Sequence, residues 1–415
     1  MLFDRFSPHR IPVPRRLAVA AALGCALILS ACTTSATDNG SPAIADGSTP
    51  VHQAEKTSEE PTFRNADTGA DLEHVAQLPL EYAQNFTVDE YDGGYRLVCV
   101  ANGERFLVVA EGQQTPENLA GDIAVIQQPL ESVYLVSTGT ICLIDEIDAL
   151  DAVTVSSVTA QESPNDNLTA ALDAGSIAYG GKYRSPDFEL IATKGCKLAI
   201  ENTKINHVPE TKQKLQDLGC TVLTEQSSSE PEVLGRLEWI KLMGILFGRE
   251  DEAEERFGEI AAQVEQVASL KPTGKTVAFF YVNEDGSAVT RRSTDYFSQM
   301  VEMAGGNFIS FDPSDEAEGS SSVQAVIDLE TFYAQAKDAD VIIYNTTVDG
   351  TVASIADLTG KNPLLADFKA VQDGEVYACD ENMYQAMTDM DDIMGDIRSA
   401  LTGTEESSGY IWKLS

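Results

Sequence analysis

The chain has 415 residues, enough for two or more domains of ordinary size, and its 43% hydrophobic content is typical of a globular protein. Its formal net charge of −38 argues against nucleic acid or an anionic membrane surface as a partner, because both require clustered Lys and Arg.

The first 31 residues have the features of a targeting segment rather than of a fold. Arg10, Arg15 and Arg16 precede an apolar run over residues 17–29, which is too short to span a membrane comfortably. The run ends in Leu29-Ser30-Ala31-Cys32, a small-residue cleavage site closed by cysteine that resembles the lipobox of bacterial lipoproteins. We therefore predict a signal peptide over residues 1–31 and a lipid on Cys32 that anchors the mature protein to the bacterial cell membrane.

The segment after the lipidation site is predicted to be a disordered tether over residues 32–70. It is rich in Ser, Thr, Asp, Gly and Pro and has almost no aromatic residues, so it cannot bury enough apolar surface to fold. Five of the seven cysteines lie beyond it. Their odd number and their apolar neighbours favour buried structural thiols over a disulfide framework.

An N-terminal α/β lobe is predicted over residues 71–233. It opens with a β-hairpin, residues 95–101 and 104–110, whose connecting Asn102-Gly103 is typical of a type I′ turn. Helical segments such as 208–218 then alternate with strands, which favours a mainly parallel sheet. The predicted strands are residues 132–136, 152–156, 197–201 and 221–224.

A helical linker is predicted over residues 234–270, followed by a second α/β lobe over residues 271–415. Apolar residues recur at threes and fours from Leu234 to Leu246 and from Ala253 to Val267, which indicates two amphipathic faces. Gly248 either separates two helices or marks a weak point in one. In the second lobe we predict strands 276–282, 341–345 and 375–379 and helices near 296–304 and over 329–336. The predicted fold class is α/β: two Rossmann-like lobes with mainly parallel sheets, joined by a long interlobe helix that permits only small closure.

Several blocks between residues 131 and 401 together resemble the cobalamin- and ferric-siderophore-binding proteins of ABC importers, whose lobes are bridged by a single long helix. No block is decisive alone, but their order and spacing match. The blocks are residues 131–136, 185–191 leading to 196–200, 295–306, 329–343, and the closing block 365–377.

The resemblance implies that a glutamate at the tip of each lobe docks onto arginines of an ABC permease. By position these are Glu189 and Glu330. Two carboxylates held far apart would fix the orientation and register of the protein on the permease, while each exposed ion pair would add little to the docking affinity. In so acidic a chain, the alternative for each is a solvated position on a helix surface.

The ligand cleft is expected between the lobes, at the carboxyl ends of the strands. Arg291 and Arg292 suit the anionic oxygens of a metal chelate, although a surface charge pair is the alternative. The tyrosines could face a planar ligand or belong to the core. The predicted ligand contacts are Thr138, Tyr183, Tyr281, Arg291, Arg292, Asn345 and Tyr384.

Neither a bound metal nor a cofactor is predicted. A receptor for bare zinc or manganese needs several His and carboxylate ligands, and only His74 and His207 lie in the predicted body. The segment Asp389-Met390-Asp391-Asp392 has Met394 where a calcium loop needs glycine, and Asn283-Glu284-Asp285-Gly286 has the composition of a hairpin turn. GxSxG, HExxH, GxGxxG and Walker motifs are missing, so we predict a binding protein rather than an enzyme.

The sequence thus predicts an extracytoplasmic, lipid-anchored, monomeric receptor that captures a ferric siderophore or haem. Its partners would be the chelate, an ABC permease with its ATPase, and a membrane through the lipid anchor only. Cobalamin is the alternative cargo within the same fold. A surface lipoprotein for sensing or adhesion, and a lipoprotein enzyme, are the alternatives from other functional classes.

Overall fold

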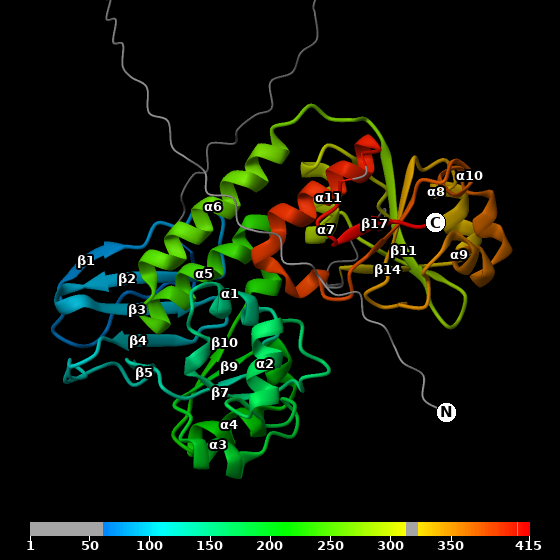
Figure 1. The fold of residues 1–415 in the computed structure, drawn as a ribbon. Helices are drawn as coiled ribbons and strands as arrows, with labels where there is room; N and C mark the ends of the chain where they lie inside the picture. The colour runs from blue at the N-terminus through cyan, green and yellow to red at the C-terminus, as the bar shows by residue number, and fades with distance from the viewer. Residues whose placement is uncertain (1–60, 313–322, 405) are drawn as a thin grey trace, which may run out of the picture. The chain divides into compact units, whose positions relative to one another are not determined.

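The structure is a computed structural model that describes residues 61–312, 323–404 and 406–415 (Figure 1). Its strands form three separate sheets, and two long helices connect the second sheet to the third along the chain. The predicted signal peptide, Cys32 and most of the predicted tether lie outside the described residues. No described helix is both long enough and apolar enough to cross a membrane.

The first sheet is an N-terminal unit that the sequence indicated only through its central hairpin. Its strands lie in chain order and are antiparallel, except that the last two are parallel. Apolar side chains are buried on both faces of the sheet. The strands are β1 (His74–Gln77), β2 (Phe86–Tyr91), β3 (Tyr95–Val100), β4 (Arg105–Val109) and β5 (Ile123–Gln127).

Two expectations for this region are wrong. Residues 61–70 are not tether: Phe63 packs against the outer face of the sheet, and the Arg64 guanidinium pairs with the buried carboxylate of Asp89 at 2.5 Å. The hairpin turn is not type I′ either. Gly103 has a positive φ of 87°, whereas Asn102 does not, and the Gly103 amide donates to the carbonyl of Val100 at 2.8 Å. This is a three-residue loop ending in a glycine at positive φ.

The first lobe confirms the four predicted strands to within one residue at each end. Its sheet is entirely parallel, in the order β10-β9-β6-β7-β8. The strands are β6 (Val133–Leu135), β7 (Val153–Ser156), β8 (Ala178–Tyr179), β9 (Leu198–Glu201) and β10 (Thr221–Thr224), and the helices are α1 (Thr140–Glu146), α2 (Asp166–Ala174), α3 (Phe188–Lys194) and α4 (Pro209–Asp217).

The interlobe connection is a pair of helices, α5 (Val233–Phe247) and α6 (Glu250–Ala268), instead of the single long helix that the resemblance implied. Gly248 ends α5 with a left-handed φ of 67°, a conformation in which glycine lacks the strain of other residues. The prediction that residues 234–246 form an amphipathic helix is wrong, because α5 is buried on every side except at Arg236 and Phe247. Helix α6 is amphipathic as expected.

The second lobe confirms the predicted strands and helices and adds antiparallel edges. Three central strands, β11, β15 and β16, are parallel, while β12, β14 and β17 pair antiparallel at the two sides. Asn283–Gly286 forms the hairpin turn between β11 and β12, as predicted. The elements are β11 (Thr276–Val282), β12 (Ala288–Arg291), α7 (Tyr296–Met303), β13 (Asn307–Phe308), β14 (Gln324–Ile327), α8 (Leu329–Ala336), β15 (Val341–Tyr344), α9 (Ile355–Lys361), α10 (Lys369–Asp373), β16 (Val376–Cys379), α11 (Met390–Thr402) and β17 (Ile411–Lys413).

The N-terminal sheet is bound to α5 by buried carboxylates as well as by apolar packing. Glu238, fully buried on α5, accepts hydrogen bonds from the backbone amides of Glu81, Tyr82 and Ala83 at 2.7–2.9 Å. Lys241 Nζ lies 3.3 Å from the same carboxylate. The ring of Phe86 meets that of Trp239 at 4.9 Å between centroids. The sheet and α5 therefore share one interior.

We expect Glu238→Gln to lower the free energy of unfolding by about 2–3 kcal/mol, because charge-assisted bonds to three buried amides weaken and the buried ammonium of Lys241 loses a partner. Urea unfolding measures this change. Glu254→Gln is the matched control, since Glu254 also pairs with Lys241 at 3.2 Å but its side chain is 66% exposed. Equal losses in both variants would show that the amide contacts contribute nothing beyond the ion pair.

Candidate functional site

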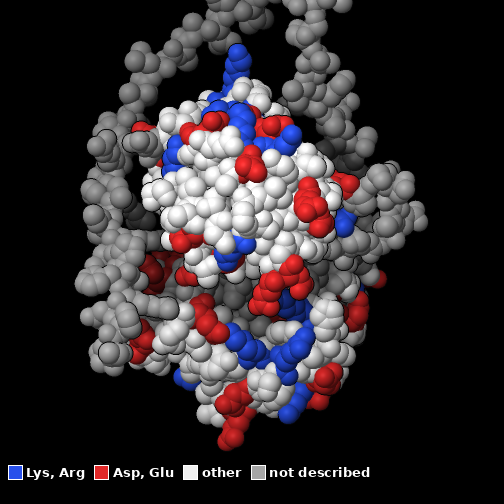
Figure 2. Space-filling view, turned by 90° about the vertical axis from the view of Figure 1, so that its right-hand side faces the viewer, with Lys and Arg blue, Asp and Glu red and all other residues white. Residues whose placement is uncertain are grey.

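The candidate site is the space between the two lobes, where the parallel strands of both sheets end. Figure 2 shows the surface hollowed between the second lobe above and the first lobe below, with basic side chains along the lower border and acidic ones beside them. At the base of this cleft α1 packs against two short turns of the second lobe, η6 (Met383–Gln385) and η7 (Met387–Asp389). A methyl group placed on Gly139 would lie 3.6 Å from the Met387 side chain, so the lobes are in direct contact there.

Two neighbouring phenol rings, each with a guanidinium group stacked on it, lie at the second-lobe side of this base. Arg236, on α5, stacks over the ring of Tyr296 at 4.0 Å, and Tyr296 meets Tyr384 edge-on at 5.7 Å between centroids. Arg291, at the end of β12, stacks over Tyr384 at 4.8 Å and donates from Nε to its hydroxyl at 3.1 Å. Stacked and hydrogen-bonded guanidinium groups have fixed planes, which suits them to bind planar anionic groups.

The electrostatics of this cluster are dominated by burial. Asp295, which begins α7, accepts a hydrogen bond from the amide of Phe297 at 3.1 Å and lies 4.0 Å from the Arg291 guanidinium. Burial raises the pKa of Asp295 above its ordinary value, although Arg291 and Arg236 oppose the shift. Burial likewise raises the pKa of Tyr384 well above its ordinary value, so this phenol stays protonated at physiological pH. The cluster thus has two guanidinium groups for one carboxylate.

The first-lobe side of the base is formed by the loop after β6 and the turn after β10. Ser137 donates from its hydroxyl to the buried carboxylate of Glu225 at 2.6 Å, and the amide of Ser227 donates to the same carboxylate at 2.8 Å. Thr138 is half-buried in this loop, with its neighbour Gly139 against Met387. Thr138 therefore lies next to the contact between the lobes, and its role as a ligand contact stays a prediction.

Five of the predicted ligand contacts fall into two groups. Arg291 and Tyr384 are brought together as described, although they are distant in sequence. Tyr183 packs partly against the outer core of the first lobe, with its hydroxyl accepting from Arg184 Nε at 2.8 Å, and Tyr281 packs against the second-lobe core. Asn345 is buried, and its side-chain oxygen accepts from the Thr347 hydroxyl at 2.6 Å. These three side chains contribute mainly to packing and local hydrogen bonds.

Arg292 lies apart from Arg291 because consecutive strand residues point to opposite faces of a sheet. Its Nε donates to the carbonyl of Gln324 at 3.4 Å, and its side chain lines an open cavity of about 450 Å³ beside β14. Sequence reasoning treated the two arginines as a pair, and the structure separates them. It also missed Arg236, which is one of three charged residues in the largely apolar run 233–247 and which nothing in the sequence distinguishes from Glu238 and Lys241.

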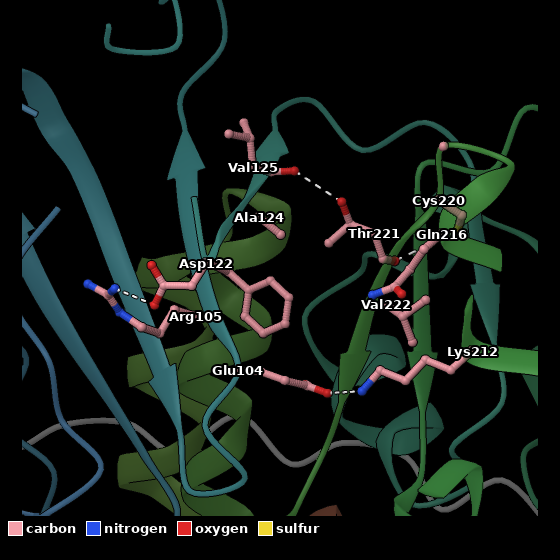
Figure 3. Close-up of a pocket in the computed structure, with 12 residues that line it drawn as sticks. Glu104, Arg105, Asp122, Ala124, Val125, Lys212, Gln216, Cys220, Thr221 and Val222 are labelled. Atoms are coloured by element: carbon pink, nitrogen blue, oxygen red, sulfur yellow. Dashed lines mark hydrogen bonds and ion pairs between the residues drawn. The ribbon is translucent and has the colours of Figure 1, made fainter. Parts of the chain in front are cut away.

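A second cavity, of about 470 Å³, lies at the seam between the N-terminal sheet and the first lobe (Figure 3). Glu104 bridges this seam: its carboxylate pairs with Lys212 of α4 and accepts from the backbone amide of Thr224 at 2.8 Å. Arg105 Nη1 and Asp122 form an ion pair of 2.7 Å on the sheet side of the cavity. None of the predicted ligand contacts lines this cavity. In both charge pairs, the two partners are themselves lining residues of the cavity.

Within the described residues there is no group of three or more His, Cys, Asp or Glu side chains positioned to hold a metal ion. His207 is exposed at the end of a short turn, in agreement with the surface role favoured for it. The acidic segment at 389–392 begins α11; Asp392 is exposed, whereas Asp389 and Asp391 are half-buried. Partial desolvation at the helix surface and the neighbouring carboxylates of Asp391, Asp389 and Asp396 raise the pKa of Asp392 to about 6.

All five described cysteines have free thiols, as favoured from the sequence. Cys99, Cys196, Cys220 and Cys379 are buried, and Cys142 is half-buried at the lobe contact. Burial raises the pKa of Cys142 to about 11, so its thiol is protonated and unreactive near neutral pH.

Glu189 and Glu330 occupy equivalent positions on their two lobes. Glu189 is exposed in the first turn of α3, which begins after Asp187; the Asp187 carboxylate accepts from the amide of Leu190 at 2.9 Å. Glu330 is exposed in the first turn of α8, which begins after Asp328; the Asp328 carboxylate accepts from the amides of Glu330 and Thr331 at 3.0 and 3.1 Å. Each capped helix therefore fixes the backbone that presents its glutamate to solvent.

A family model described as periplasmic binding protein matches residues 132–383, more than half of the chain. The chain belongs to the periplasmic binding protein family. This confirms the resemblance drawn from the sequence blocks and the α/β fold class. Family and fold are those of substrate-binding proteins. The N-terminal sheet precedes the part that the family model matches.

Curated relatives and solved structures agree with this assignment. An uncharacterized lipoprotein of Methanocaldococcus jannaschii is 25% identical over 352 residues, covering 78% of this chain and 81% of the relative. A second lipoprotein of that organism is 27% identical over 323 residues, covering 74% and 78%. The periplasmic haem-binding protein HutB of Vibrio cholerae has a TM-score of 0.52 at 16% identity and covers 64% of this chain and 98% of its own. A periplasmic haem-binding protein from Pseudomonas aeruginosa has the same TM-score and identity, covering 69% and 98%.

Proposed function

We propose that this periplasmic binding protein is a lipid-anchored extracytoplasmic receptor of an ABC importer and that it captures a metal chelate, a ferric siderophore or haem, in its interlobe cleft. The observation that carries the proposal is the stacked cluster of Arg291, Tyr384, Tyr296 and Arg236 at the base of the cleft. Tyr296 is buried, and the half-buried members, Tyr384, Arg291 and Arg236, offer one aromatic ring to a planar or macrocyclic ligand and fixed guanidinium planes to its anionic oxygens.

Three further observations support parts of this proposal. The scarcity of metal-binding side chains favours a ligand that brings its metal already chelated. The lipobox-like sequence ending at Cys32 and the naming of two relatives as lipoproteins support the anchor. The exposed positions of Glu189 and Glu330 at the starts of α3 and α8 support docking to a permease, whose ATPase would drive release of the ligand.

Thermal unfolding of the mature chain, from Cys32 onward, tests the cargo class directly. We expect one class of chelate, at about 100 times its dissociation constant, to raise the free energy of unfolding by about 2.7 kcal/mol. Ferric tris-catecholate, ferric tris-hydroxamate, haem, cobalamin, Zn²⁺ and Mn²⁺ are compared at equal concentration. A shift with cobalamin alone would select the alternative cargo of the same fold, and a shift with a bare ion alone would contradict the chelate proposal.

A further inference from the structure

The N-terminal sheet and the first lobe meet along two edge strands, β5 and β10, which lie side by side but, within the described part of the chain, form no ladder with each other. Side chains take the place of the missing bonds between the strands. The Thr221 hydroxyl donates to the carbonyl of Val125 at 3.2 Å, and the Glu104 carboxylate accepts from the amide of Thr224 at 2.8 Å. The cavity of Figure 3 opens beside these bridges, so the seam between the two sheets is not tightly packed.

Glu104 also binds the first lobe through a cation. Its carboxylate pairs with Lys212 Nζ of α4 and accepts from the Thr224 hydroxyl at 2.7 Å. Lys212 Nζ lies 3.2 Å from the same hydroxyl oxygen. We call Glu104, Lys212 and Thr224 the seam latch. Because β3 is tied to α6 by the ion pair of Arg96 and Glu250 at 3.0 Å, the latch also connects the first lobe to the interlobe helices.

A second carboxyl group lies next to the seam latch. Glu201 pairs with Thr224 on the neighbouring parallel strand, so their two side chains lie on the same face of the sheet. Glu201 is fully buried, and neither of its oxygens has a hydrogen-bond partner among the described residues. The positive charge of Lys212 acts on Glu201 as well. One ammonium group therefore faces two carboxyl groups, and of the two it bonds to Glu104.

Glu201 changes its charge at a pH where its neighbours keep theirs. Burial raises the pKa of Glu201 to about 8. The other titratable groups that face it are the phenol of Tyr134 on β6 and the thiol of Cys220 before β10. Burial raises the pKa of Cys220 to about 12 and that of Tyr134 well above its ordinary value, so both stay protonated up to pH 9. Glu225 bonds to Ser137 at the cleft instead.

When Glu201 ionises, two carboxylates compete for Lys212. The Glu201 carboxylate is fully buried and has no donor of its own among the described residues, and an unpaired carboxylate in that environment is strongly unfavourable. The Glu104 side chain is 15% exposed, borders the cavity and keeps the Thr224 amide and hydroxyl as donors. The ammonium group therefore stabilises Glu201 more than Glu104, and the new negative charge repels the Glu104 carboxylate.

We propose that Glu201 and Lys212 make the seam latch respond to protons. With Glu201 protonated, Lys212 holds Glu104 and the seam is closed. When Glu201 releases its proton to solvent, Lys212 turns to Glu201, and Glu104 withdraws from Thr224 into the cavity. The first lobe then moves more freely against the N-terminal sheet and the interlobe helices. This device lies outside the cleft and does not depend on which cargo the cleft binds.

Amide hydrogen exchange of the mature chain, resolved to single residues, reports the latch at the N–H of Thr224. We expect the protection of this amide, corrected for the intrinsic pH dependence of exchange, to be about tenfold lower at pH 9 than at pH 6.5. The amide of Ala83 is the internal reference. It also donates to a carboxylate, that of Glu238 at 2.7 Å, and should keep its protection at both pH values.

Three variants identify the group that operates the latch. Glu201→Gln keeps the shape of the side chain without its ionisation, so Thr224 should be equally protected at both pH values. Glu104→Gln should lower the protection at both, because a neutral amide holds Lys212 weakly. Glu210→Gln, at an exposed position on α4, should behave as the wild type. Equal protection of Thr224 at both pH values in the wild type, or a loss at pH 9 that persists in Glu201→Gln, would overturn the proposal.

Discussion

Reversing the charge of both predicted docking glutamates, Glu189→Lys with Glu330→Lys, is expected to abolish ligand uptake while leaving ligand affinity unchanged. If each carboxylate pairs with an arginine of the permease, a lysine at that position replaces attraction by repulsion. Each reversal should lower the affinity for the permease about tenfold, and the two together about 100-fold. Both residues are exposed and neither touches the cleft cluster, so the binding site and the fold should be unaffected.

The measurement is uptake of the labelled chelate by cells that depend on this receptor, alongside the dissociation constant of each purified variant. Glu210→Lys with Asp338→Lys is the matched control, because these residues are also exposed, lie on the same two lobes and change the net charge equally. Uptake that survives the reversal at Glu189 and Glu330 would contradict docking through these glutamates and favour sensing or adhesion. Loss of uptake in both double variants would mean that only net charge matters.

The second large effect concerns Glu201, a carboxyl group buried at the end of β9. It is fully buried, and neither of its carboxyl oxygens has a hydrogen-bond partner among the described residues. Burial raises the pKa of Glu201 to about 8, and Lys212 only partly opposes the shift. Glu201 is therefore mostly protonated in the folded protein near pH 7, whereas in the unfolded chain it ionises near pH 4.5.

Because the folded pKa is the higher one, the unfolded state releases its proton first as the pH rises. Glu201 therefore lowers the stability progressively between about pH 4.5 and pH 8, and the loss levels off above that range. We expect Glu201→Gln, which removes the ionisation, to be more stable than the wild type by about 3–5 kcal/mol at pH 8 and to show little difference at pH 4.5.

Urea unfolding of both proteins at a series of pH values from 4.5 to 9 measures this difference, and other titrating groups cancel in the subtraction. Glu162→Gln serves as control, since its side chain is 51% exposed and pairs with Lys182. Parallel stability curves for wild type and Glu201→Gln would mean that Glu201 finds a partner, such as an internal water, that holds its carboxylate ionised.

The strands and helices of the two lobes could be predicted because their signals are local. Buried parallel strands such as Val133–Leu135 and Val341–Tyr344 are continuous runs of apolar and aromatic residues, and helices such as Leu329–Ala336 follow a capping residue. The N-terminal sheet was mostly missed for two reasons. Its first strand, His74–Gln77, is short and exposed. Its last strand, Ile123–Gln127, pairs with β4, but a long loop separates the two strands in the sequence. Phe63 and Arg64 act through partners far along the sequence, so composition alone assigned them to the tether.

The binding cluster shows the same limit. Arg291 could be proposed as a basic residue in a very acidic chain and Tyr384 as a residue after the predicted strand 375–379, but their contact depends on how β12 and the turn after β16 are placed. Arg236 could not be placed from periodicity, since α5 is buried nearly all round and a fully buried helix has no polar face against which one residue stands out. Strand geometry explains why Arg291 and Arg292 point in different directions, but only after the structure shows that β12 ends at residue 291.

The burial of α5 by the N-terminal sheet has a consequence for how this protein can be divided or recombined. The family match begins at residue 132, yet Trp239, fully buried on α5, is covered by Phe86 of the preceding sheet. A fragment cut at the family boundary would leave that indole, the carboxylate of Glu238 and the apolar side of the helix facing water. The 71 residues before the boundary (61–131) are thus not an accessory that can be exchanged freely between relatives, and changes in them must be matched by changes on helix α5.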